Sequence, residues 1–321
     1  MMEPAQYLMG FLMDPYQTLN LETDTSLLCI DELQRRGHRV FWLETANLDL
    51  VNGELQAGLR EVLATSPLRL GAEESGPLSR LDGLLVRKDP PFDDSYLHLT
   101  YLLDFLPPGV VCVNSPRALR NINEKLATFH WPAYCPDSLV TFNPNRLLSF
   151  ARRYQRIVVK PLDECSGRGI RFFNGADPDL ASQLVDVMRS IDGRQRYMLA
   201  QEYLPAVSAG DKRVYLLGQQ PVGWVNRIPA PGSDLANIHQ GARCEATELT
   251  NHEREVCTQV GQWLLAQGVL LAGLDFIGGR LTEINVTSPS AVRQINAVMQ
   301  VKLEIQLVDG LLESLDRAQS R

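Results

Sequence analysis

Oxygen-bearing side chains gather in one apolar segment of the chain, LDFIGGRLTEINVTSP at 274–289. An apolar run, a Gly-Gly-Arg turn and a second apolar run predict a β-hairpin. Glu283 and Asn285 are two residues apart on the second strand, so both side chains point to one face, and Asp275 lies on the partner strand. Carboxylate and amide oxygens are the ligands that Mg²⁺ prefers in proteins. The segment is therefore a candidate magnesium site.

A second interpretation of the same carboxylates is an ion pair. A carboxylate in apolar surroundings is costly unless a positive group meets it, and Arg280 and Arg293 are nearby in the sequence. The segment alone does not decide between metal and ion pair. The metal interpretation carries a geometric condition, because Asp275 and Glu283 share a face only when the turn holds an odd number of residues. We therefore predict a three-residue loop at 278–280.

The composition is that of an ordinary globular protein. The chain has 321 residues, of which 45% are hydrophobic and 21% are charged, enough for two or three domains with their own cores. The formal net charge is −7, with no block of Lys or Arg, so we expect no nucleic-acid partner. No stretch approaches the roughly 20 apolar residues of a membrane span, so we expect no membrane partner.

The cysteines and the N-terminus indicate a compartment. The six cysteines are scattered, with no C-x-x-C pair and no zinc-type spacing, and Cys165 alone falls in a glycine-containing loop. The first residues do not resemble a signal peptide. Free thiols without a secretion signal are typical of a reducing environment, which predicts a cytoplasmic protein.

The first third of the chain alternates apolar strands with helices. Asp24-Thr25-Ser26 predicts a helix cap before the amphipathic run at 27–36. Strands that alternate with helices predict an α/β fold, with a parallel sheet covered on both faces. The expected strands lie at 7–13, 40–43, 84–86 and 110–113.

Polar residues follow three of these strands. Asp14 follows the first strand, Arg87 and Asp89 follow the third, and Asn114 and Ser115 follow the fourth. Ligands of such sheets bind at the carboxyl ends of the strands. One polar loop would carry little meaning, but three in register predict a binding edge.

A second unit begins near residue 121, where residues 123–125 are expected to open a helix. A strand at 156–163 and another at 170–173 flank a loop at 164–169 that holds two glycines. Such a loop can lie over a phosphate and donate backbone N–H groups. Many such loops only connect the strands of a hairpin, so this signal is weak by itself.

The last part of the chain adds a possible base-binding segment and a loop. A strand at 197–204 leaves Glu202 beside a Tyr-Leu pair, which is suited to the edge and face of a purine. The stretch at 229–241 is rich in Pro, Gly, Ser and Asn, and predicts a mobile loop. Arg227 and Arg243 flank that loop, and a helix at 253–267 precedes the hairpin.

Several motifs, in this order and spacing, resemble bacterial glutathione synthetase, a member of the ATP-grasp superfamily. The resemblance runs from about residue 7 to beyond residue 300. The two longest motifs, RKDPPFD and LTEINVTSP, are specific. The motifs are MDP at 13–15, RKDPPFD at 87–93, NEK at 123–125, KPLD at 160–163, GDKR at 210–213, RIP at 227–229 and LTEINVTSP at 281–289.

The resemblance implies a fold, a reaction and its cofactors. The implied fold is an N-terminal pre-ATP-grasp substrate domain at 1–122, with the parallel sheet, followed by a two-part α+β ATP-grasp domain at 123–321. The lid part of that domain is 123–200 and the catalytic part is 201–321. ATP phosphorylates a carboxylate, and the amine of a second substrate attacks the acyl phosphate. ATP and two Mg²⁺ ions, with Mn²⁺ able to substitute, are implied, as are small-molecule substrates and a homo-oligomer.

The resemblance also assigns roles to residues of this sequence. It assigns nucleotide binding to Lys125, Lys160, Ser166, Gly167, Gln201, Glu202, Tyr203, Leu204 and Asp211. It assigns the metal ions to Asp275, Glu283 and Asn285. It assigns catalytic roles to Arg213, Arg227, Asn237 and Arg243, of which Arg213 and Arg227 would hold the acyl phosphate or a substrate carboxylate. It assigns substrate binding to Asp14, Arg87, Asp89, Ser288 and Arg293.

The chain departs from the family in its loops. The phosphate loop is usually Asp-Gly-Met-Gly-Gly but reads DECSG at 163–167 here, and Glu164 would repel a triphosphate unless it points outward. In the mobile loop Leu235 stands where an Arg is usual, and Gly241-Ala242 where a Gly pair is usual. SPSA at 288–291 lacks the usual Thr-Cys. The chain is thus a divergent glutathione synthetase or a paralogue that joins another acid and amine.

Two further expectations concern function. A binding protein with an inactive ATP-grasp fold would have lost the phosphate lysines or the metal ligands, and all of them are present. The loop at 229–241 is expected to be poorly ordered without ligand and to close over the acyl phosphate. Because Leu235 replaces a cation, we also expect a substrate preference shifted away from γ-glutamylcysteine and glycine.

Overall fold

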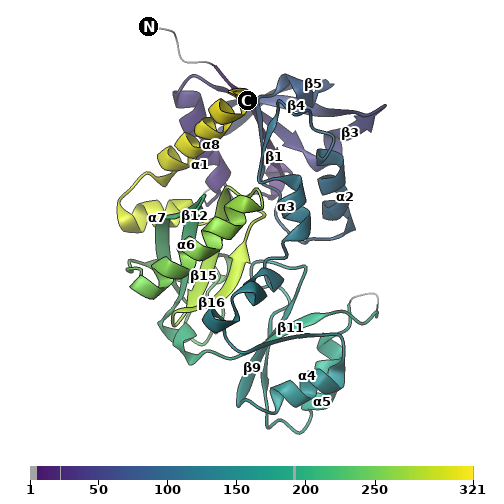
Figure 1. Cartoon of the computed structure of the whole chain (residues 1–321), viewed down its shortest axis with the longest axis vertical. Helices are drawn as coiled ribbons and strands as arrows, with labels where there is room; N and C mark the ends of the chain where they lie inside the picture. The colour runs from purple at the N-terminus through teal and green to yellow at the C-terminus, as the bar shows by residue number, and fades with distance from the viewer. Residues whose placement is uncertain (1–5, 22, 191–192, 321) are drawn as a thin grey trace.

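The computed structural model of the chain describes residues 6–21, 23–190 and 193–320. Within these residues the strands form three sheets, each in its own part of the molecule (Figure 1). The N-terminal unit holds a seven-stranded sheet, the middle of the chain a four-stranded sheet, and the C-terminal part a five-stranded sheet. No helix of the described chain is long and apolar enough to cross a membrane.

Four parallel strands form the centre of the N-terminal sheet, in the order β2-β1-β6-β7. Their side chains are mostly buried, as expected for strands covered on both faces. The predicted strands are confirmed, and so is the helix cap, because the Asp24 side chain accepts the Leu27 N–H at 2.9 Å. The elements are β1 (Leu8–Met13), α1 (Thr25–Arg35), β2 (Arg39–Glu44), β6 (Gly83–Val86), α2 (Asp94–Leu103), β7 (Val111–Val113) and α3 (Pro116–Asn121).

The predicted parallel sheet is wrong at one edge. Between β2 and β6 the chain adds β3 (Leu48–Val51), β4 (Glu54–Thr65) and β5 (Leu68–Pro77), all paired antiparallel. β5 is largely exposed and carries charged residues, so it lacks the apolar run that reveals a central strand. The hydrophobic pattern therefore misses this antiparallel edge.

The middle of the chain forms an antiparallel sheet of order β10-β9-β11-β8. Helices α4 (Pro144–Ala151) and α5 (Leu180–Val187) pack on it around a shared apolar core. The predicted hairpin of two strands around the glycine-containing loop is confirmed. The strands are β8 (Ser138–Thr141), β9 (Arg156–Pro161), β10 (Arg171–Asn174) and β11 (Met198–Glu202).

The C-terminal sheet has the order β14-β13-β12-β15-β16 and is antiparallel throughout. Helix α6 (Asn251–Ala266) packs against it and begins with a reciprocal capping box between Thr250 and Glu253, so the predicted helix is confirmed. The other elements are β12 (Asp211–Leu217), β13 (Gln220–Ile228), β14 (Arg243–Glu245), β15 (Leu271–Ile277), β16 (Arg280–Asn285), α7 (Val292–Met299) and α8 (Leu303–Gln319).

The last helix returns to the beginning of the chain. α8 lies beside α1, at the opposite end of the molecule from the four-stranded sheet (Figure 1). Ile30 of α1 and Leu307 of α8 belong to one apolar core, and Arg36 Nη1 lies 2.6 Å from Asp309 Oδ1. The N-terminal and C-terminal units therefore share a core across the sequence.

The helix expected to open at 123–125 is a short 3₁₀ helix instead, Leu126–His130. The Asn123 side-chain oxygen accepts the N–H groups of Lys125 at 3.1 Å and Leu126 at 3.0 Å, just ahead of this helix. Further 3₁₀ helices are Tyr16–Thr18, Thr45–Asn47, Leu78–Arg80, Pro132–Tyr134, Pro205–Ala209 and Ile238–Gln240.

Asn114 fastens the end of β7 to the C-terminal sheet. Its Oδ1 accepts the N–H groups of Leu270 at 2.9 Å and Leu271 at 3.0 Å. Its Nδ2 donates to the carbonyls of Leu271 at 2.8 Å and Val286 at 2.7 Å. The residue is only 3% exposed, so these bonds satisfy the side chain without water.

We predict that Asn114→Ala lowers the free energy of unfolding by about 2–4 kcal/mol, because buried backbone groups of two strands lose their partners. Chemical denaturation measures the change. The matched control is Asn121→Ala, at the exposed end of α3, which should stay within about 0.5 kcal/mol of wild type. Equal losses in the two variants would contradict the prediction.

Candidate active site

The turn of the candidate metal hairpin holds two residues, not three. Ile277 pairs with Arg280 across the turn, and the loop residues Gly278 and Gly279 have φ values of +57° and +77°. Two successive positive φ values are typical of a type I′ turn, which glycine adopts without strain. The predicted three-residue loop is therefore wrong.

A β-bulge restores the shared face that the short turn would have broken. The register shifts between Asp275 and Phe276, so that Asp275 stands opposite Glu283 while Phe276 stands opposite Leu281. Thr282 is the extra residue, and its hydroxyl donates to the Asp275 carbonyl at 3.2 Å. One inserted residue moves every later side chain of that strand to the opposite face of the sheet. The two carboxylates therefore face the same side, as the metal interpretation requires.

Asp275 is buried and held by two arginines. Arg213 donates to both of its oxygens, at 2.5 and 2.8 Å, and Arg227 Nη2 lies 3.0 Å from Oδ1. The Asn285 amide donates at 3.3 Å. Burial alone would raise the pKa of Asp275, but the two guanidinium groups outweigh it and hold the pKa far below its ordinary value.

Asp211 extends this charge network on the neighbouring strand. Arg227 Nη2 lies 2.8 Å from Asp211 Oδ2, while the buried Oδ1 has no hydrogen-bond partner. Burial raises the pKa of Asp211 to about 6, although Arg227 opposes the shift. An acceptor that is buried and unpaired is costly, so Asp211 Oδ1 is available to a ligand.

Glu283 meets the lysines of the lid. Lys125 Nζ lies 3.2 Å from Glu283 Oε1 and donates to the Glu164 carbonyl at 2.5 Å. Burial tends to lower the pKa of Lys125, but Glu283 and Glu124 raise it above its ordinary value. Lys160 has a lowered pKa because burial dominates there. An anionic ligand would relieve this cost at Lys160.

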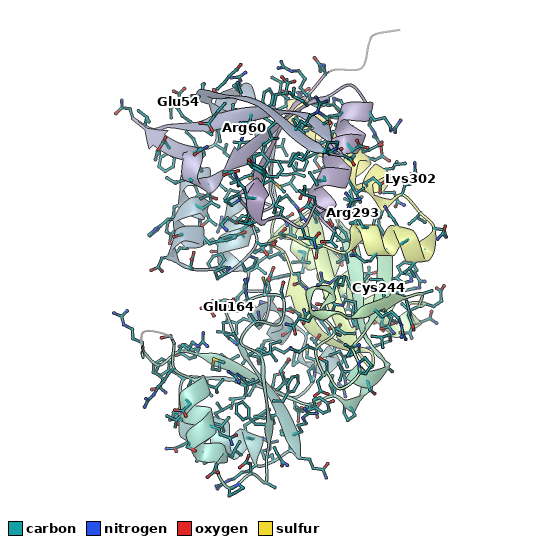
Figure 2. All side chains as sticks on the ribbon, turned by 180° about the vertical axis from the view of Figure 1, so that it is seen from behind. Glu54, Arg60, Glu164, Cys244, Arg293 and Lys302 are labelled. Atoms are coloured by element: carbon teal, nitrogen blue, oxygen red, sulfur yellow. The ribbon has the colours of Figure 1, made fainter. Side chains whose placement is uncertain are left out.

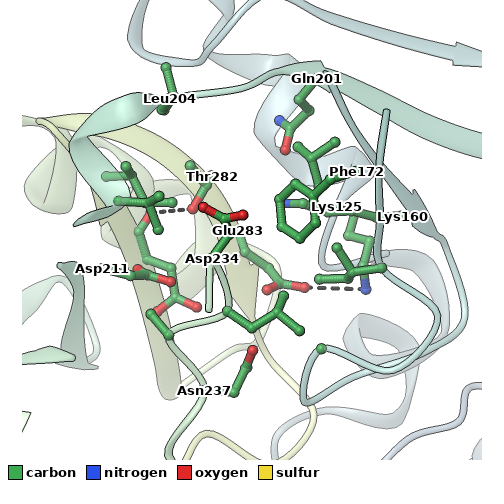
Figure 3. A pocket seen from close by; sticks show the side chains of 18 of the residues that line it. Lys125, Lys160, Phe172, Gln201, Leu204, Asp211, Asp234, Asn237, Thr282 and Glu283 are labelled. Carbon is green, nitrogen blue, oxygen red and sulfur yellow. Dashed lines mark hydrogen bonds and ion pairs between the residues drawn. The ribbon is translucent and has the colours of Figure 1, made fainter. Parts of the chain in front are cut away.

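A first cavity lies between the four-stranded sheet and the C-terminal sheet (Figure 3). Lys160, Phe172 and Gln201 of the four-stranded sheet lie opposite Asp211 across it. Every residue that the sequence assigned to the nucleotide lines this cavity, and so do Asp275 and Glu283. The arrangement supplies cations, apolar walls and oxygen donors in one place.

A second cavity, of about 510 Å³, opens on the carboxyl edge of the N-terminal sheet. Glu283 and Asn237 line both cavities, which therefore meet at these residues. The predicted residues found in the second cavity are Arg87, Asp89, Ser166, Arg213, Arg227, Asn237, Glu283, Asn285 and Ser288. Two adjoining cavities can hold a nucleotide and a second substrate with their reacting groups at the junction.

Three predicted site residues line neither cavity. The Asp14 carboxylate accepts hydrogen bonds from Lys88 Nζ at 2.6 Å and from the Asp89 N–H at 2.8 Å. Asp14 therefore supports the loop that carries Asp89. Arg293 donates to the Asp24 carbonyl at 3.1 Å and lies nearer the N-terminal sheet than Glu164 does (Figure 2). The assignment of both residues to substrate binding stays a prediction, since neither of them lines the two cavities described here.

Arg243 is the third such residue. It lies on the edge strand β14 and pairs with Glu245 at 2.6 Å, with its side chain 72% exposed. Residues two apart on a strand share a face, so Arg243 and Glu245 pair with each other at the surface. The catalytic role assigned to Arg243 is therefore not supported in this arrangement.

Sequence reasoning missed several contributors. Glu124 is buried, and its Oε1 accepts the N–H groups of Val286 at 2.8 Å and Thr287 at 3.0 Å, which fixes the end of the hairpin. The signal that could have identified Glu124 is its position between Asn123 and Lys125 in the NEK motif. The loop after Asp14 also lines the second cavity, through Thr18 and Thr23, and only its position after β1 indicated this.

The altered phosphate loop does not place an unpaired charge in the site. Arg168 Nε donates to Glu164 Oε2 at 2.8 Å, so the added carboxylate is neutralised within its own loop. Arg168 also donates to the Pro90 carbonyl at 2.8 Å, and Gln240 donates to the Ser166 carbonyl at 3.0 Å. The loop thus contacts both the N-terminal unit and the segment at 229–241.

Leu235 lies on the nucleotide side of the site. It lines the first cavity with Ala236 and Asn237, but it does not line the second. The shifted substrate preference that we expect from this substitution stays a prediction.

The oxygen donors suit a hard cation that arrives with a nucleotide. No group of three or more His, Cys, Asp or Glu in the described residues forms a complete metal site by itself. Asp275, Glu283 and Asn285 nevertheless lie together beside the lysines of the first cavity. Mg²⁺ usually binds through one or two carboxylates and the phosphates of its substrate. The donor set fits that pattern.

The arrangement of lid, C-terminal sheet and shared cavity is that of ATP-grasp ligases. The solved D-cycloserine synthetase DcsG superposes with a TM-score of 0.67 at 12% identity, over 96% of this chain and 99% of that one. The D-alanyl-alanine synthetase A of Vibrio cholerae gives a TM-score of 0.60 at 14% identity, over 98% and 99%. These similarities show the fold.

Sequence comparison identifies the family of the chain within the ATP-grasp ligases. The prokaryotic glutathione synthetase N-terminal domain matches residues 8–120, and the ATP-grasp domain of the same enzyme matches 124–300. Glutathione synthetase of Salmonella typhimurium strain LT2 is 38% identical over 309 residues, 94% of this chain and 97% of that protein. The Escherichia coli K12 enzyme is 37% identical over the same shares. The chain belongs to the prokaryotic glutathione synthetase family and is an ATP-dependent ligase.

We predict that Asp275→Asn lowers the free energy of unfolding at pH 7 by about 3–5 kcal/mol, because it leaves Arg213 and Arg227 buried without a full counter-charge. Folding lowers the pKa of Asp275. Its contribution is therefore present above the unfolded pKa of about 4 and is lost as the pH falls toward the folded pKa. Urea denaturation at several pH values measures this.

The control for this prediction is Glu245→Gln, which breaks the exposed pair with Arg243 and should leave stability unchanged. The gap between wild type and Asp275→Asn should also narrow on acidification. A gap of constant size from pH 7 to pH 3 would contradict the prediction.

Proposed function

We propose that this chain is a glutathione synthetase that joins γ-glutamylcysteine to glycine. ATP phosphorylates the substrate carboxylate, glycine attacks the acyl phosphate through its amine, and glutathione, ADP and phosphate result. One observation carries the proposal. The residues assigned to the nucleotide line one cavity. A second cavity, lined by arginines, adjoins the first at Glu283 and Asn237.

The lid residues of the first cavity are suited to the nucleotide. Lys125 and Lys160 would neutralise phosphate oxygens, since phosphoryl transfer depends on positioning and on charge compensation. Gln201, Glu202, Tyr203 and Leu204 follow one another at the end of β11, where backbone groups and apolar side chains can take up adenine. Asp211 Oδ1, which has no partner, completes this side.

The second cavity is suited to the acid and the amine. Arg213 and Arg227 line it and contact Asp275, which lines the first cavity, and they would stabilise the charge of the acyl phosphate. Arg87, Asp89 and Ser288 also line it and would hold the acid substrate. Closure of the loops at 164–169 and 229–241 would keep water from the acyl phosphate.

The proposal includes two Mg²⁺ ions, with Mn²⁺ as a substitute, held by Asp275, Glu283 and Asn285. Bound Mg²⁺ would neutralise phosphate charge as that charge develops. The proposal also includes a cytoplasmic homo-oligomer, as the family implies. The alternative is a paralogue that joins another acid and amine. Two departures from the family favour it, namely Glu164, which lines the first cavity, and Cys165, which lines both cavities.

The experiment that tests the function is ADP release with panels of acids and amines, with each product identified by mass. We expect γ-glutamylcysteine and glycine to give the fastest turnover, on the order of 10 per second. ADP release that depends on a different pair would establish the paralogue. No ADP release with any pair would contradict the ligase.

We predict that Glu283→Gln lowers the turnover number by at least about a hundredfold and leaves the fold intact, because a charge that faces the metal and Lys125 is lost. Steady-state kinetics at saturating Mg²⁺ measure this. Glu54→Gln, at the exposed first residue of β4 (Figure 2), is the control and should match wild type. An unchanged turnover number in Glu283→Gln would remove this residue from the mechanism.

Lys160→Ala should mainly weaken the use of ATP. The variant loses one phosphate contact, which we expect to raise the KM for ATP by about tenfold or more. Lys302→Ala, an exposed lysine ahead of α8, serves as the control. Ordinary KM and turnover in Lys160→Ala would show that this lysine does not meet the nucleotide.

A further inference from the structure

The segment at 229–241 is fastened to the lid through an acidic residue. Arg156 Nη2 donates to Asp234 Oδ2 at 2.5 Å, and the Tyr203 hydroxyl donates to Asp234 Oδ1 at 2.6 Å. Both carboxylate oxygens are therefore occupied by donors from the lid unit. The hydrogen bond from Tyr203 and the charge of Arg156 lower the pKa of Asp234, so the carboxylate is ionised at neutral pH.

The partners of Asp234 are tied to the wall of the first cavity, which Tyr203 lines directly and Arg156 reaches through two aromatic rings. The Arg156 guanidinium lies 4.2 Å from the centre of the Tyr203 ring and 4.9 Å from that of Phe172. Tyr203 and Phe172 meet edge to face at 6.0 Å, and both line the cavity. Stacking of a cation on two rings fixes its position. Asp234 is thus anchored to the adenine side of the site.

A second attachment holds the other end of the segment. Gln240 Nε2 donates to the Ser166 carbonyl at 3.0 Å. A Cβ at Gly167 would lie 2.7 Å from both Asn237 Oδ1 and Gln240 Nε2, and Gly167 has a φ of +78°. Glycine adopts this φ without strain, and its lack of a Cβ leaves room for the two side chains. The segment therefore rests closely on the phosphate loop as well as on the adenine side.

Between the two attachments the segment forms a wall of the first cavity. Leu235 and Ala236 line it, and Ala236 is only 4% exposed. A bound nucleotide would consequently touch the segment directly. The segment does more than cover the second substrate.

We propose that Asp234 and Arg156 are positioning residues that latch the segment at 229–241 against the adenine side of the nucleotide cavity. The nucleotide enters before the segment docks, and ADP leaves only after Asp234 separates from Arg156 and Tyr203. The proposal rests on the proposed function in one respect, namely that the first cavity takes a nucleotide. It makes nucleotide retention depend on residues outside the phosphate and metal contacts.

The test measures release of a fluorescent ADP with Mg²⁺ by stopped-flow displacement. Asp234→Ala and Arg156→Ala should each speed release by about tenfold, because charge-assisted hydrogen bonds are lost. The double variant should be no faster than either single variant, since both remove one interaction. The KM for ATP should rise in each variant, while the KM for the acid substrate should stay near wild type.

Glu61→Gln is the matched control, because it breaks a two-point pair with Arg39 at 2.9 and 2.8 Å on the N-terminal sheet. It should release ADP at the wild-type rate. A second measurement follows chymotrypsin cleavage after Leu235. ADP with Mg²⁺ should protect this bond in wild type but not in Asp234→Ala.

Two results would overturn the latch. ADP release and protease protection that are unchanged in Asp234→Ala would show that the contact only braces a loop, and would leave the proposed function untouched. Additive effects of the two substitutions would show that they act separately. Wild-type protein that does not bind ADP would overturn the nucleotide assignment and the latch together.

Discussion

Asp275 is buried in the C-terminal sheet, where Arg213 on the adjacent strand β12 and Arg227 on β13, one strand further away, compensate its charge. Removing a carboxylate from water costs several kcal/mol unless cations and hydrogen bonds replace the solvent. Two further contacts belong to the same charge network. Arg227 also pairs with Asp211, and the Asn285 amide contacts Asp275. The strand register that aligns these residues is therefore constrained by charge as well as by packing.

The same constraint connects the sheet to the lid. Glu283 stands opposite Asp275, and Lys125 approaches it from the chain that leads into the lid. Each carboxylate is thus held by a cation that a phosphorylated ligand could also attract. In the proposed reaction the nucleotide would share these cations, and its metal would share the carboxylates. Ion pairs that hold the site together also prepare it for charged substrates.

The sequence predicts the site well where an apolar strand precedes a polar motif. Lys160 at the end of β9 and Glu202 at the end of β11 both reach the cavity that was expected. Prediction failed at the hairpin turn, because the bulge at Thr282, which turns the side chains of the strand to the opposite face, has no sequence signature. The position of Arg243 close to a motif was also not informative, because its side chain pairs with Glu245 at the surface.

The account depends most on the claim that Asp275 and Glu283 are already paired with cations and become metal ligands only with a nucleotide. Titration with Mn²⁺, followed by electron paramagnetic resonance with and without ADP, tests this claim directly. We predict weak Mn²⁺ binding to the protein alone, and binding at least about tenfold tighter with ADP than in ADP solution without protein. Tight Mn²⁺ binding that ADP does not change would contradict the account.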